Sequence, residues 1–324
     1  MERRALGRDS RLSRQMAWTI LGLLVVYGGV LAYLTAFAVL WGWYGAPALG
    51  LAAFIPVGLV LVALAPYRTA LRFVGAEIVE PVEEPSLHAA LDRLCALADV
   101  PKPRLAVSPA HVPEAFAVGL RRSRSVIVVT RGLLARLEPR EVEAVLAHEL
   151  AHVVNRDGAV MTVASFPLFA GSWLVQRARE KPALLLVLFF VWPYALAACV
   201  LYFVCQALTR NLAICRELSA DRGAAILTGS PEALASALQK LTGALPLIPK
   251  EDLRRAVPLN ALLIVGVDPL QRAHPPVQER ISQLAAIGRE EGRAAPPSSR
   301  SPVALAAVVF LAVFAGMLVL FMRM

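Results

Sequence analysis

The residues best suited to chemistry lie in the segment Val145–Asp157. His148 and His152 are four positions apart, so on a helix both imidazoles project from one face and can bind a single metal ion. Glu149 lies on the flank of that face, where a carboxylate can take a proton from a metal-bound water without binding the metal itself. This H-E-x-x-H spacing predicts zinc bound by His148 and His152, with Glu149 as the catalytic base.

The sequence around this motif favours a helix. H-E-x-x-H occurs by chance in about one chain in a hundred of this length, so the motif needs support from its context. Pro139 suits the first turn of a helix, and Glu141 and Glu143 place acidic side chains near a helix N-terminus. Apolar residues then recur at helical spacing, at Val142, Val145, Leu146, Leu150 and Val153.

A catalytic zinc ion needs a third protein ligand, and the segment Arg216–Asp221 offers the best candidate. Glu217 and Asp221 share one helix face, so Glu217 can bind the metal while Asp221 orients a ligating histidine. The alternative is an exposed helix face on which Arg216 pairs with these acids. Asp157 ends the first motif, where capping and charge pairing account for it; it is a secondary candidate for supporting the metal ligands.

Three motifs in this order carry a family resemblance. His148–Asp157 reads H-E-L-A-H-V-V-N-R-D, Arg216–Asp221 reads R-E-L-S-A-D, and His274–Ile281 reads H-P-P-V-Q-E-R-I. From about Pro81 to Leu284 the chain resembles the HtpX-type membrane zinc metallopeptidases, which are relatives of the CAAX prenyl proteases. The resemblance implies an α+β, gluzincin-like zinc metallopeptidase domain. It also implies an endopeptidase that degrades misfolded or damaged membrane proteins in an envelope stress response.

The resemblance gives two further parts of the chain candidate roles. By similarity to the CAAX prenyl proteases, His274 is expected to donate a hydrogen bond to the tetrahedral oxyanion; capping or packing at the start of a proline-initiated helix is the alternative. Val112–Ala117 is expected to form a sheet edge that aligns an extended substrate. Glu114 stands where Asn is usual in the family, which leaves its role open. His88 and His111 are interpreted as ordinary surface residues.

The composition predicts that much of the chain lies in lipid. Of its 324 residues 57% are hydrophobic, and the mean hydropathy is +0.60, above that of soluble globular domains. The net charge of +9 reflects arginines at the N-terminus and beside apolar segments, not a basic patch interleaved with aromatics, which argues against nucleic-acid binding. The four cysteines have no C-x-x-C spacing, so free thiols are expected.

The predicted fold is a multi-spanning α-helical membrane protein with an α+β, gluzincin-like zinc metallopeptidase domain. Two apolar hairpins and a last helix are long enough to cross a bilayer, although 159–175 is marginal. The expected parts are the basic cytoplasmic N-terminus 1–15, the transmembrane hairpin 16–66, the first part of the peptidase domain 67–158, the second membrane hairpin 159–208, the second part of the peptidase domain 209–287, the linker 288–302 and the C-terminal transmembrane helix 303–324.

Arginines flanking the first hairpin place the peptidase domain on the cytoplasmic side of the cell (inner) membrane. The loop 176–182 argues against this topology, because it is basic and yet expected outside. We give the N-terminal charges more weight, since His152 and Glu217 must meet on one side of the membrane.

Within the peptidase domain, the sequence predicts a helix over Ser86–Ala98 capped by Ser86, and strands at Arg104–Val107 and Ser125–Thr130. A second catalytic helix is expected over Thr209–Leu227, ended by Gly229–Glu232, which also caps the next helix. A short helix is expected after the prolines that follow His274, ending at about residue 287.

The predicted function is zinc-dependent endoproteolysis in quality control of membrane proteins. One zinc ion per chain is bound by His148, His152 and Glu217, and the partners are polypeptide substrates, above all membrane proteins, and the lipid bilayer. Alternatives are a site-selective processing protease of CAAX type and a catalytically silent membrane scaffold. A scaffold would be free to lose Glu149, and a transporter would need ionisable residues in its apolar segments. No oligomeric state is predicted.

Overall fold

The computed structural model describes residues 74–119, 124–158, 192–244 and 274–290, together with isolated residues outside these ranges. The chain divides into two compact units. The first contains residues 1–12, 65–160 and 213–297, and the second contains residues 13–64, 161–212 and 298–324. Every candidate site residue belongs to the first unit, so the site lies entirely within that unit.

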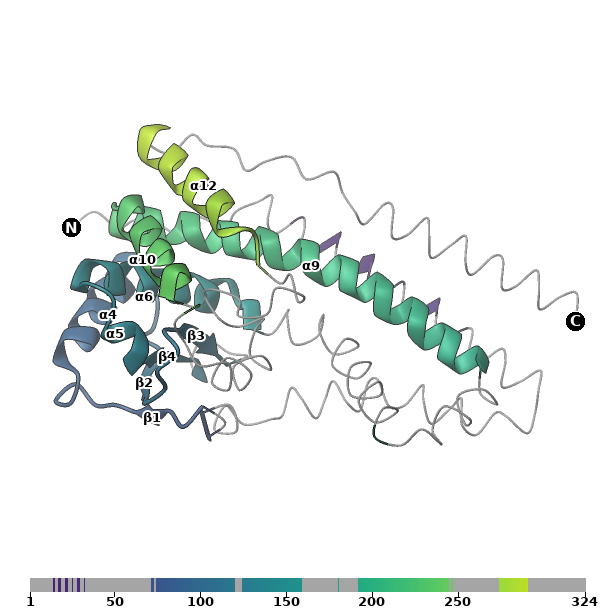
Figure 1. Ribbon diagram of the computed structural model, residues 1–324, viewed down its shortest axis with the longest axis horizontal. Coiled ribbons are helices and arrows are strands. Elements are labelled where there is room, and N and C mark those ends of the chain that lie inside the picture. The colour runs from purple at the N-terminus through teal and green to yellow at the C-terminus, as the bar shows by residue number, and fades with distance from the viewer. Residues whose placement is uncertain are drawn as a thin grey trace, which may run out of the picture. The chain divides into compact units, whose positions relative to one another are not determined.

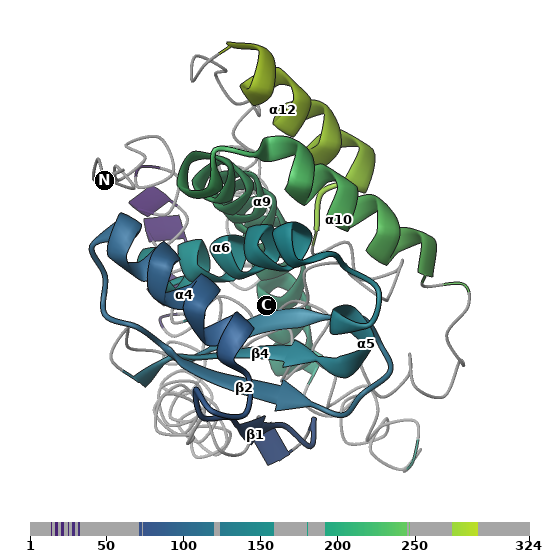
Figure 2. The same ribbon diagram turned by 90° about the vertical axis from the view of Figure 1, so that its left-hand side faces the viewer.

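A four-stranded sheet forms one layer of the first unit (Figures 1 and 2). The described strands are β1 (Glu77–Ile78), β2 (Arg104–Ser108), β3 (Ala115–Val118) and β4 (Val126–Thr130), in the order β1-β2-β4-β3. β2 and β4 run parallel, with Leu105 opposite Ile127, whereas β1 and β3 are antiparallel to their neighbours. The two strands predicted from β-branched runs are confirmed, because they correspond to β2 and β4.

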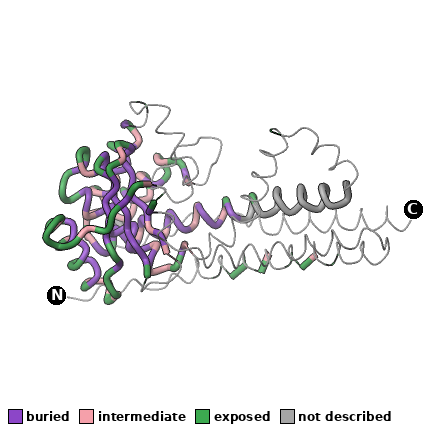
Figure 3. Tube along the Cα trace, turned by 90° about the horizontal axis from the view of Figure 1, so that it is seen from below, coloured by how far each residue is buried: buried purple, intermediate pink, exposed green. Residues whose placement is uncertain are grey.

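Side chains alternate between the two faces of the sheet, as the pleat requires. Leu105 and Val107 of β2 and Ile127 and Val129 of β4 belong to the large core beneath the helices. The intervening residues, such as Ala106 of β2, pack in a smaller cluster on the other face. All five residues of β4 are buried, as expected for a strand covered on both faces. Buried residues gather in the interior of this part of the chain and exposed ones on its outside (Figure 3).

Helix α4 (Pro85–Ala98) lies with α6 over one face of the sheet (Figure 2). The expected cap at Ser86 is wrong: the helix begins at Pro85, with Glu84 at the capping position and no side-chain cap. Proline has no N–H to satisfy and a fixed φ, so it starts a helix readily. His88 is not a surface residue either, because it is buried and its Nε2 lies 3.0 Å from the carbonyl oxygen of Val79. His111 is exposed, as expected.

Helix α5 (Arg131–Leu134) is one short turn that follows β4, and α6 (Pro139–Asn155) is the helix predicted around the H-E-x-x-H motif. α6 begins with a capping box in which the N–H of Glu138 donates to Glu141 Oε2 at 2.8 Å. Glu141 also accepts hydrogen bonds from Ser236 Oγ and Lys240 Nζ of α10. The N-terminus of α6 is thereby tied to a helix almost a hundred positions later.

Helix α9 runs without a break from Trp192 to Thr228. Its C-terminal end matches the expected one to within a residue, because Gly229 takes a left-handed φ of 67° and α10 (Pro231–Ala244) starts two residues later. Helix α12 (Val277–Glu290) follows the prolines after His274, again as predicted, and packs on α10. α10 in turn packs on α6 (Figure 2).

The expected membrane segments fall mainly on residues that are not described. The hairpin 16–66 apart from isolated residues, most of 159–208, nearly all of the linker 288–302 and the helix 303–324 lie outside the described residues. In the part of the chain that the structure describes, no helix combines the length and apolar character that crossing a membrane requires.

Candidate metal centre

Helix α6 places the His148 imidazole and the Glu149 carboxylate in buried positions and the His152 imidazole in a half-buried one. His148 and His152 lie one turn apart on the same face, and the other faces of the helix are anchored in the core by fully buried residues such as Leu146 and Leu150. Glu149 is also buried, at 1% exposure. The capped, core-packed helix therefore holds these polar groups inside the protein, where each needs a specific partner.

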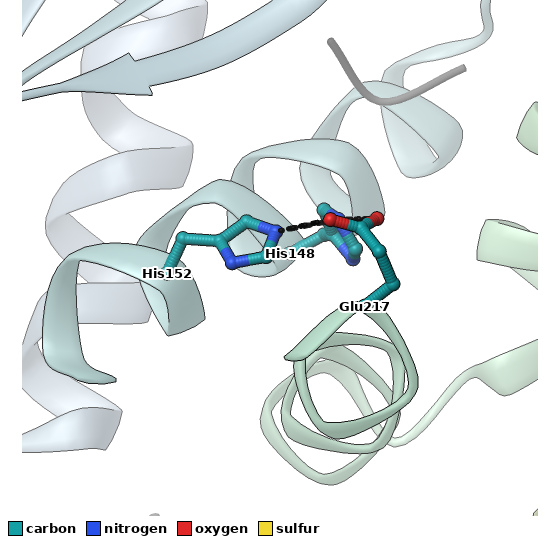
Figure 4. Close-up of side chains that lie close together, drawn as sticks. All are labelled: His148, His152 and Glu217. Carbon is teal, nitrogen blue, oxygen red and sulfur yellow. Dashed lines mark hydrogen bonds and ion pairs between the residues drawn. The ribbon is translucent and has the colours of Figure 1, made fainter. Parts of the chain in front are cut away.

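Glu217 reaches the two histidines from α9 (Figure 4). Its Oε2 lies 3.6 Å from His148 Nε2 and its Oε1 lies 3.5 Å from His152 Nε2, while the two Nε2 atoms are 3.1 Å apart. In a tetrahedral zinc site with bonds of about 2.0–2.1 Å, neighbouring ligand atoms lie about 3.3–3.4 Å apart. The three groups therefore have the chemistry and the spacing of a zinc ligand set.

The other nitrogen of each ring faces an aspartate. His148 Nδ1 lies 3.0 Å from Asp221 Oδ1, and His152 Nδ1 lies 2.6 Å from Asp157 Oδ2. A carboxylate beside Nδ1 favours the tautomer that carries its hydrogen on Nδ1, which leaves Nε2 of each neutral ring with a lone pair. Two such lone pairs and the Glu217 carboxylate repel one another unless a positive charge lies among them.

The charges of the buried groups also favour a cation. Burial by itself lowers the pKa of His148, but Asp221 and Glu217 outweigh it and raise that pKa to about 9, so the position attracts positive charge. Among the described residues, the buried charged groups around the centre are four carboxylates and two guanidiniums, namely Glu149, Asp157, Glu217, Asp221, Arg216 and Arg280. With neutral histidines these groups carry two excess negative charges, which a divalent ion would balance.

Each aspartate is itself held by a buried arginine. Arg280 of α12 donates from Nε and Nη2 to the two oxygens of Asp221, at 2.8 and 2.7 Å. Burial alone would raise the pKa of Asp221, but Arg280 outweighs it and the pKa is lowered. Arg216 Nε of α9 lies 3.1 Å from Asp157 Oδ2. Each arginine thereby holds its aspartate in the orientation that faces the imidazole.

Glu149 differs from the other acids, because burial raises its pKa and the nearby histidines only partly oppose this. Its Oε2 has no hydrogen-bond partner among the described residues. A carboxylate with a raised pKa can both accept and return a proton near neutral pH. His274, just before α12, lies beside the ligand set, with its Nδ1 3.5 Å from Glu217 Oε2.

Comparison with known proteins decides the family. A model described as Peptidase family M48 matches residues 81–287. The chain belongs to peptidase family M48. This match covers the stretch over which the HtpX-type resemblance was expected, so that prediction is confirmed.

Curated relatives named protease HtpX homolog match most of the chain. "Protease HtpX homolog" of Moorella thermoacetica is 39% identical over 306 residues, covering 89% of this chain and 98% of the relative. "Protease HtpX homolog 1" of Streptomyces coelicolor is 41% identical over 308 residues, covering 89% and 97%. A crystal structure of S. mikatae Ste24p aligns with 85% of this chain and with 66% of the Ste24p chain, at 17% sequence identity. The TM-score of 0.38 is too low to define a shared fold. The chain is therefore a metalloprotease, as predicted.

The M48 chain brings together the residues that the sequence singled out. His148, His152 and Glu217 converge on one point, Glu149 is buried on the same helix as the histidines, Asp221 lies against His148, and Asp157, only a secondary candidate, lies against His152. The alternative of an exposed, salt-bridged face at Arg216–Asp221 is wrong, because its three charged side chains are buried.

Sequence reasoning missed Arg280 and did not assign Arg216 to Asp157. Arg280 lies within the His274 motif, which is the one signal that could have indicated it. A single arginine on an amphipathic helix is ordinarily exposed, so its burial at 1% could not be inferred from the pattern.

Proposed function

We propose that this metalloprotease is a zinc-dependent endopeptidase whose metal is bound by His148, His152 and Glu217. The observation that carries the proposal is the convergence of three metal-binding groups, with each histidine oriented by a buried aspartate. Zinc held there would supply Lewis acidity, lowering the pKa of a water molecule and polarising the peptide carbonyl. Two nitrogens and one carboxylate leave room for water and substrate, which is typical of catalytic rather than structural zinc.

Glu149 is the proposed general base and acid. It takes one proton from the attacking water as the oxygen bonds to the carbonyl carbon, and it gives that proton to the amide nitrogen as the C–N bond breaks. Burial raises the pKa of Glu149, which brings it closer to the range where both transfers are fast. Asp221 and Arg280, which lie further from the reacting atoms, hold His148 in place.

His274 is the proposed donor to the oxyanion that forms during attack. Its contact with Glu217 Oε2 places the imidazole at the edge of the ligand set, and the two prolines that follow fix the backbone at the start of α12. Burial raises the pKa of Glu217, but His274 and the other histidines outweigh it and the pKa is lowered well below its ordinary value. The ligand is thereby kept as a carboxylate.

The substrate is proposed to bind as an extended strand along β3. In the described part of the chain, β3 is one of the two edge strands of the sheet; it pairs only with β4 and, unlike β1, packs against α6. Backbone groups on an edge strand can hydrogen-bond to any extended peptide, so this binding depends little on sequence. Glu114, just before β3, is buried, and its backbone N–H donates to Thr130 Oγ1 at 2.9 Å.

The physiological setting is proposed to be quality control of membrane proteins, with the peptidase domain on the cytoplasmic side of the cell membrane. Two arguments support this: the apolar segments 16–66, 159–208 and 303–324, and relatives that bear the name protease HtpX homolog. The relaxed recognition of an edge strand would suit damaged substrates of varied sequence.

The test compares the detergent-purified chain with Glu149→Gln and with Glu143→Gln, a partly exposed carboxylate on the same helix. Digestion of an unfolded protein and bound zinc are measured for each. Parent and Glu143→Gln should cleave at many sites, whereas Glu149→Gln should lose about 10²–10⁴-fold in rate and keep its zinc. Cleavage at a single site would favour a processing protease, and zinc binding without turnover of any substrate would favour a silent scaffold. Absence of metal from all three would refute the proposal.

A further inference from the structure

The turn that ends α6 directs Asp157 back toward the metal centre. α6 ends at Asn155, and Arg156 then takes a left-handed conformation with φ 59° and ψ 35°. Its N–H bonds to the carbonyl oxygens of His152 and Val153, which closes the last turn of the helix. This reversal is what allows a residue five positions after His152 to place its Oδ2 2.6 Å from the His152 ring.

The conformation of Arg156 is uncommon for a residue with a Cβ, and its side chain is exposed. The turn is held from its other side as well. A Cβ placed on Gly158 would lie 2.9 Å from the carbonyl oxygen of Gly119, at the end of β3, so the backbones approach closely there. Backbone strain retained beside a functional group indicates that the position of the turn matters.

Arg216 holds the Asp157 carboxylate that this turn brings next to His152. It immediately precedes Glu217 on α9, is 5% exposed, and places Nε 3.1 Å from Asp157 Oδ2. Its Nη2 lies 3.4 Å from His152 Nδ1. A guanidinium cannot accept a hydrogen bond, so Nδ1 directs its hydrogen to Asp157 and not to the arginine.

We infer that Asp157 and Arg216 form a positioning pair that holds His152 in its metal-binding orientation. This pair, with Asp157 from the turn after α6 and Arg216 from α9, does for His152 what Asp221 and Arg280 do for His148. Asp157 fixes the tautomer and direction of the ring, and Arg216 pairs with the buried Asp157 and keeps it turned away from the metal, where a loose carboxylate would compete as a ligand. The inference rests on the proposed zinc site.

Zinc affinity is the direct test, measured on the full chain in detergent by competition with a chromophoric chelator. Asp157→Asn and Arg216→Met should each weaken zinc binding by about 10–100-fold, as loss of a partner behind a ligating histidine does. Arg216→Lys should recover part of that loss, because it retains the charge without the planar fork. Asp92→Asn, an exposed carboxylate on α4, is the matched control and should bind zinc like the parent.

A second pair of variants tests the turn without touching the polar groups. Arg156→Gly keeps a left-handed conformation available and should bind zinc as the parent does, whereas Arg156→Val disfavours it and should weaken binding as Asp157→Asn does. The visible spectrum of the Co²⁺-substituted protein should shift in Asp157→Asn and Arg156→Val, because the geometry of a ligand changes. Far-UV circular dichroism checks that each variant is folded.

Two negative results are distinguishable. If Asp157→Asn, Arg216→Met and Arg156→Val bind zinc as tightly as the parent and keep its cobalt spectrum, the positioning pair is refuted while the zinc site stands. If the parent binds no more tightly than His152→Ala, the proposed zinc site itself fails, and the inference fails with it.

Discussion

Replacing Arg280 with methionine would leave Asp221 as a buried carboxylate without its main partner. Arg280 is 1% exposed and Asp221 is fully buried, and two hydrogen bonds of 2.7 and 2.8 Å join them. Removing one member of such a pair costs about 3–5 kcal/mol, chiefly because the remaining charge is left uncompensated. Methionine fills much of the vacated volume, so we expect a loss of about 3 kcal/mol rather than the upper figure.

The measurement has to report on the first unit alone. All five tryptophans lie outside it, so their fluorescence would not follow its unfolding. Hydrogen exchange read by mass spectrometry on peptides of α6 and α12 gives the free energy of local opening directly. A chelator should be present, because otherwise weakened zinc binding would add to the apparent loss of stability.

A double-mutant cycle separates the pair from simple packing. Asp221→Asn alone should also be destabilising, because it leaves the buried Arg280 with Glu217, 3.4 Å from its Nη1, as its remaining ion-pair partner. The double variant should lose less than the two single variants together, since neither charge remains unpaired. An opening free energy for Arg280→Met within about 1 kcal/mol of the parent would refute this reasoning, as would strict additivity in the cycle.

Three further predictions concern positions away from the metal. Gly132→Ala should lower the free energy of unfolding by at least about 2 kcal/mol, because its Cβ would lie 2.1 Å from the carbonyl oxygen of His111. The Cβ of Gly243→Ala on α10 would meet nothing within 4 Å, so this control should be neutral or stabilising by up to about 1 kcal/mol in thermal unfolding. Burial alone would raise the pKa of Glu141, but the hydrogen bonds that its carboxylate accepts from α10 outweigh burial and lower that pKa. The ionised Glu141 therefore stabilises the fold above its ordinary pKa of 4.5, and this stabilisation is lost at lower pH. The difference in melting temperature between the parent and Glu141→Gln should shrink from pH 6 to pH 3. Burial raises the pKa of the Cys95 thiol to about 11, so peptide mapping should find it unalkylated by iodoacetamide at pH 8 in the folded chain.

Local patterns in the sequence predicted the elements that local forces determine. The β-branched runs of β2 and β4 and the capped, periodic α6 follow from residues within a few positions of one another. His148 and His152 share a face because of helical geometry alone. By contrast, β1 is two residues long and exposed, and nothing in Glu77–Ile78 distinguishes it from a loop; it exists because β2 offers an edge to pair with.

Contacts between distant positions were the part that sequence reasoning could not predict. Arg280 and Asp221 are 59 positions apart, and a charged residue on a helix gives no sign that it will be buried against a carboxylate. His88 was assigned to the surface for the same reason, since its partner is a backbone carbonyl that only the fold brings near. The contact of Asp157 with His152 depends on the left-handed turn at Arg156, and a non-glycine residue gives no sequence signal for that conformation.

The order of the site residues along the chain affects biosynthesis. The two histidines are made first, Glu217 follows with α9, and the arginine that secures Asp221 belongs to α12. Roughly 130 residues separate His152 from Arg280, on the order of ten seconds of translation at about 5–20 residues per second. A nascent chain therefore emerges with its histidines before the rest of the proposed metal ligands and their supports. On the proposed site we expect proteolytic competence only once α12 has left the ribosome and docked, so that an unfinished chain does not digest itself or its neighbours.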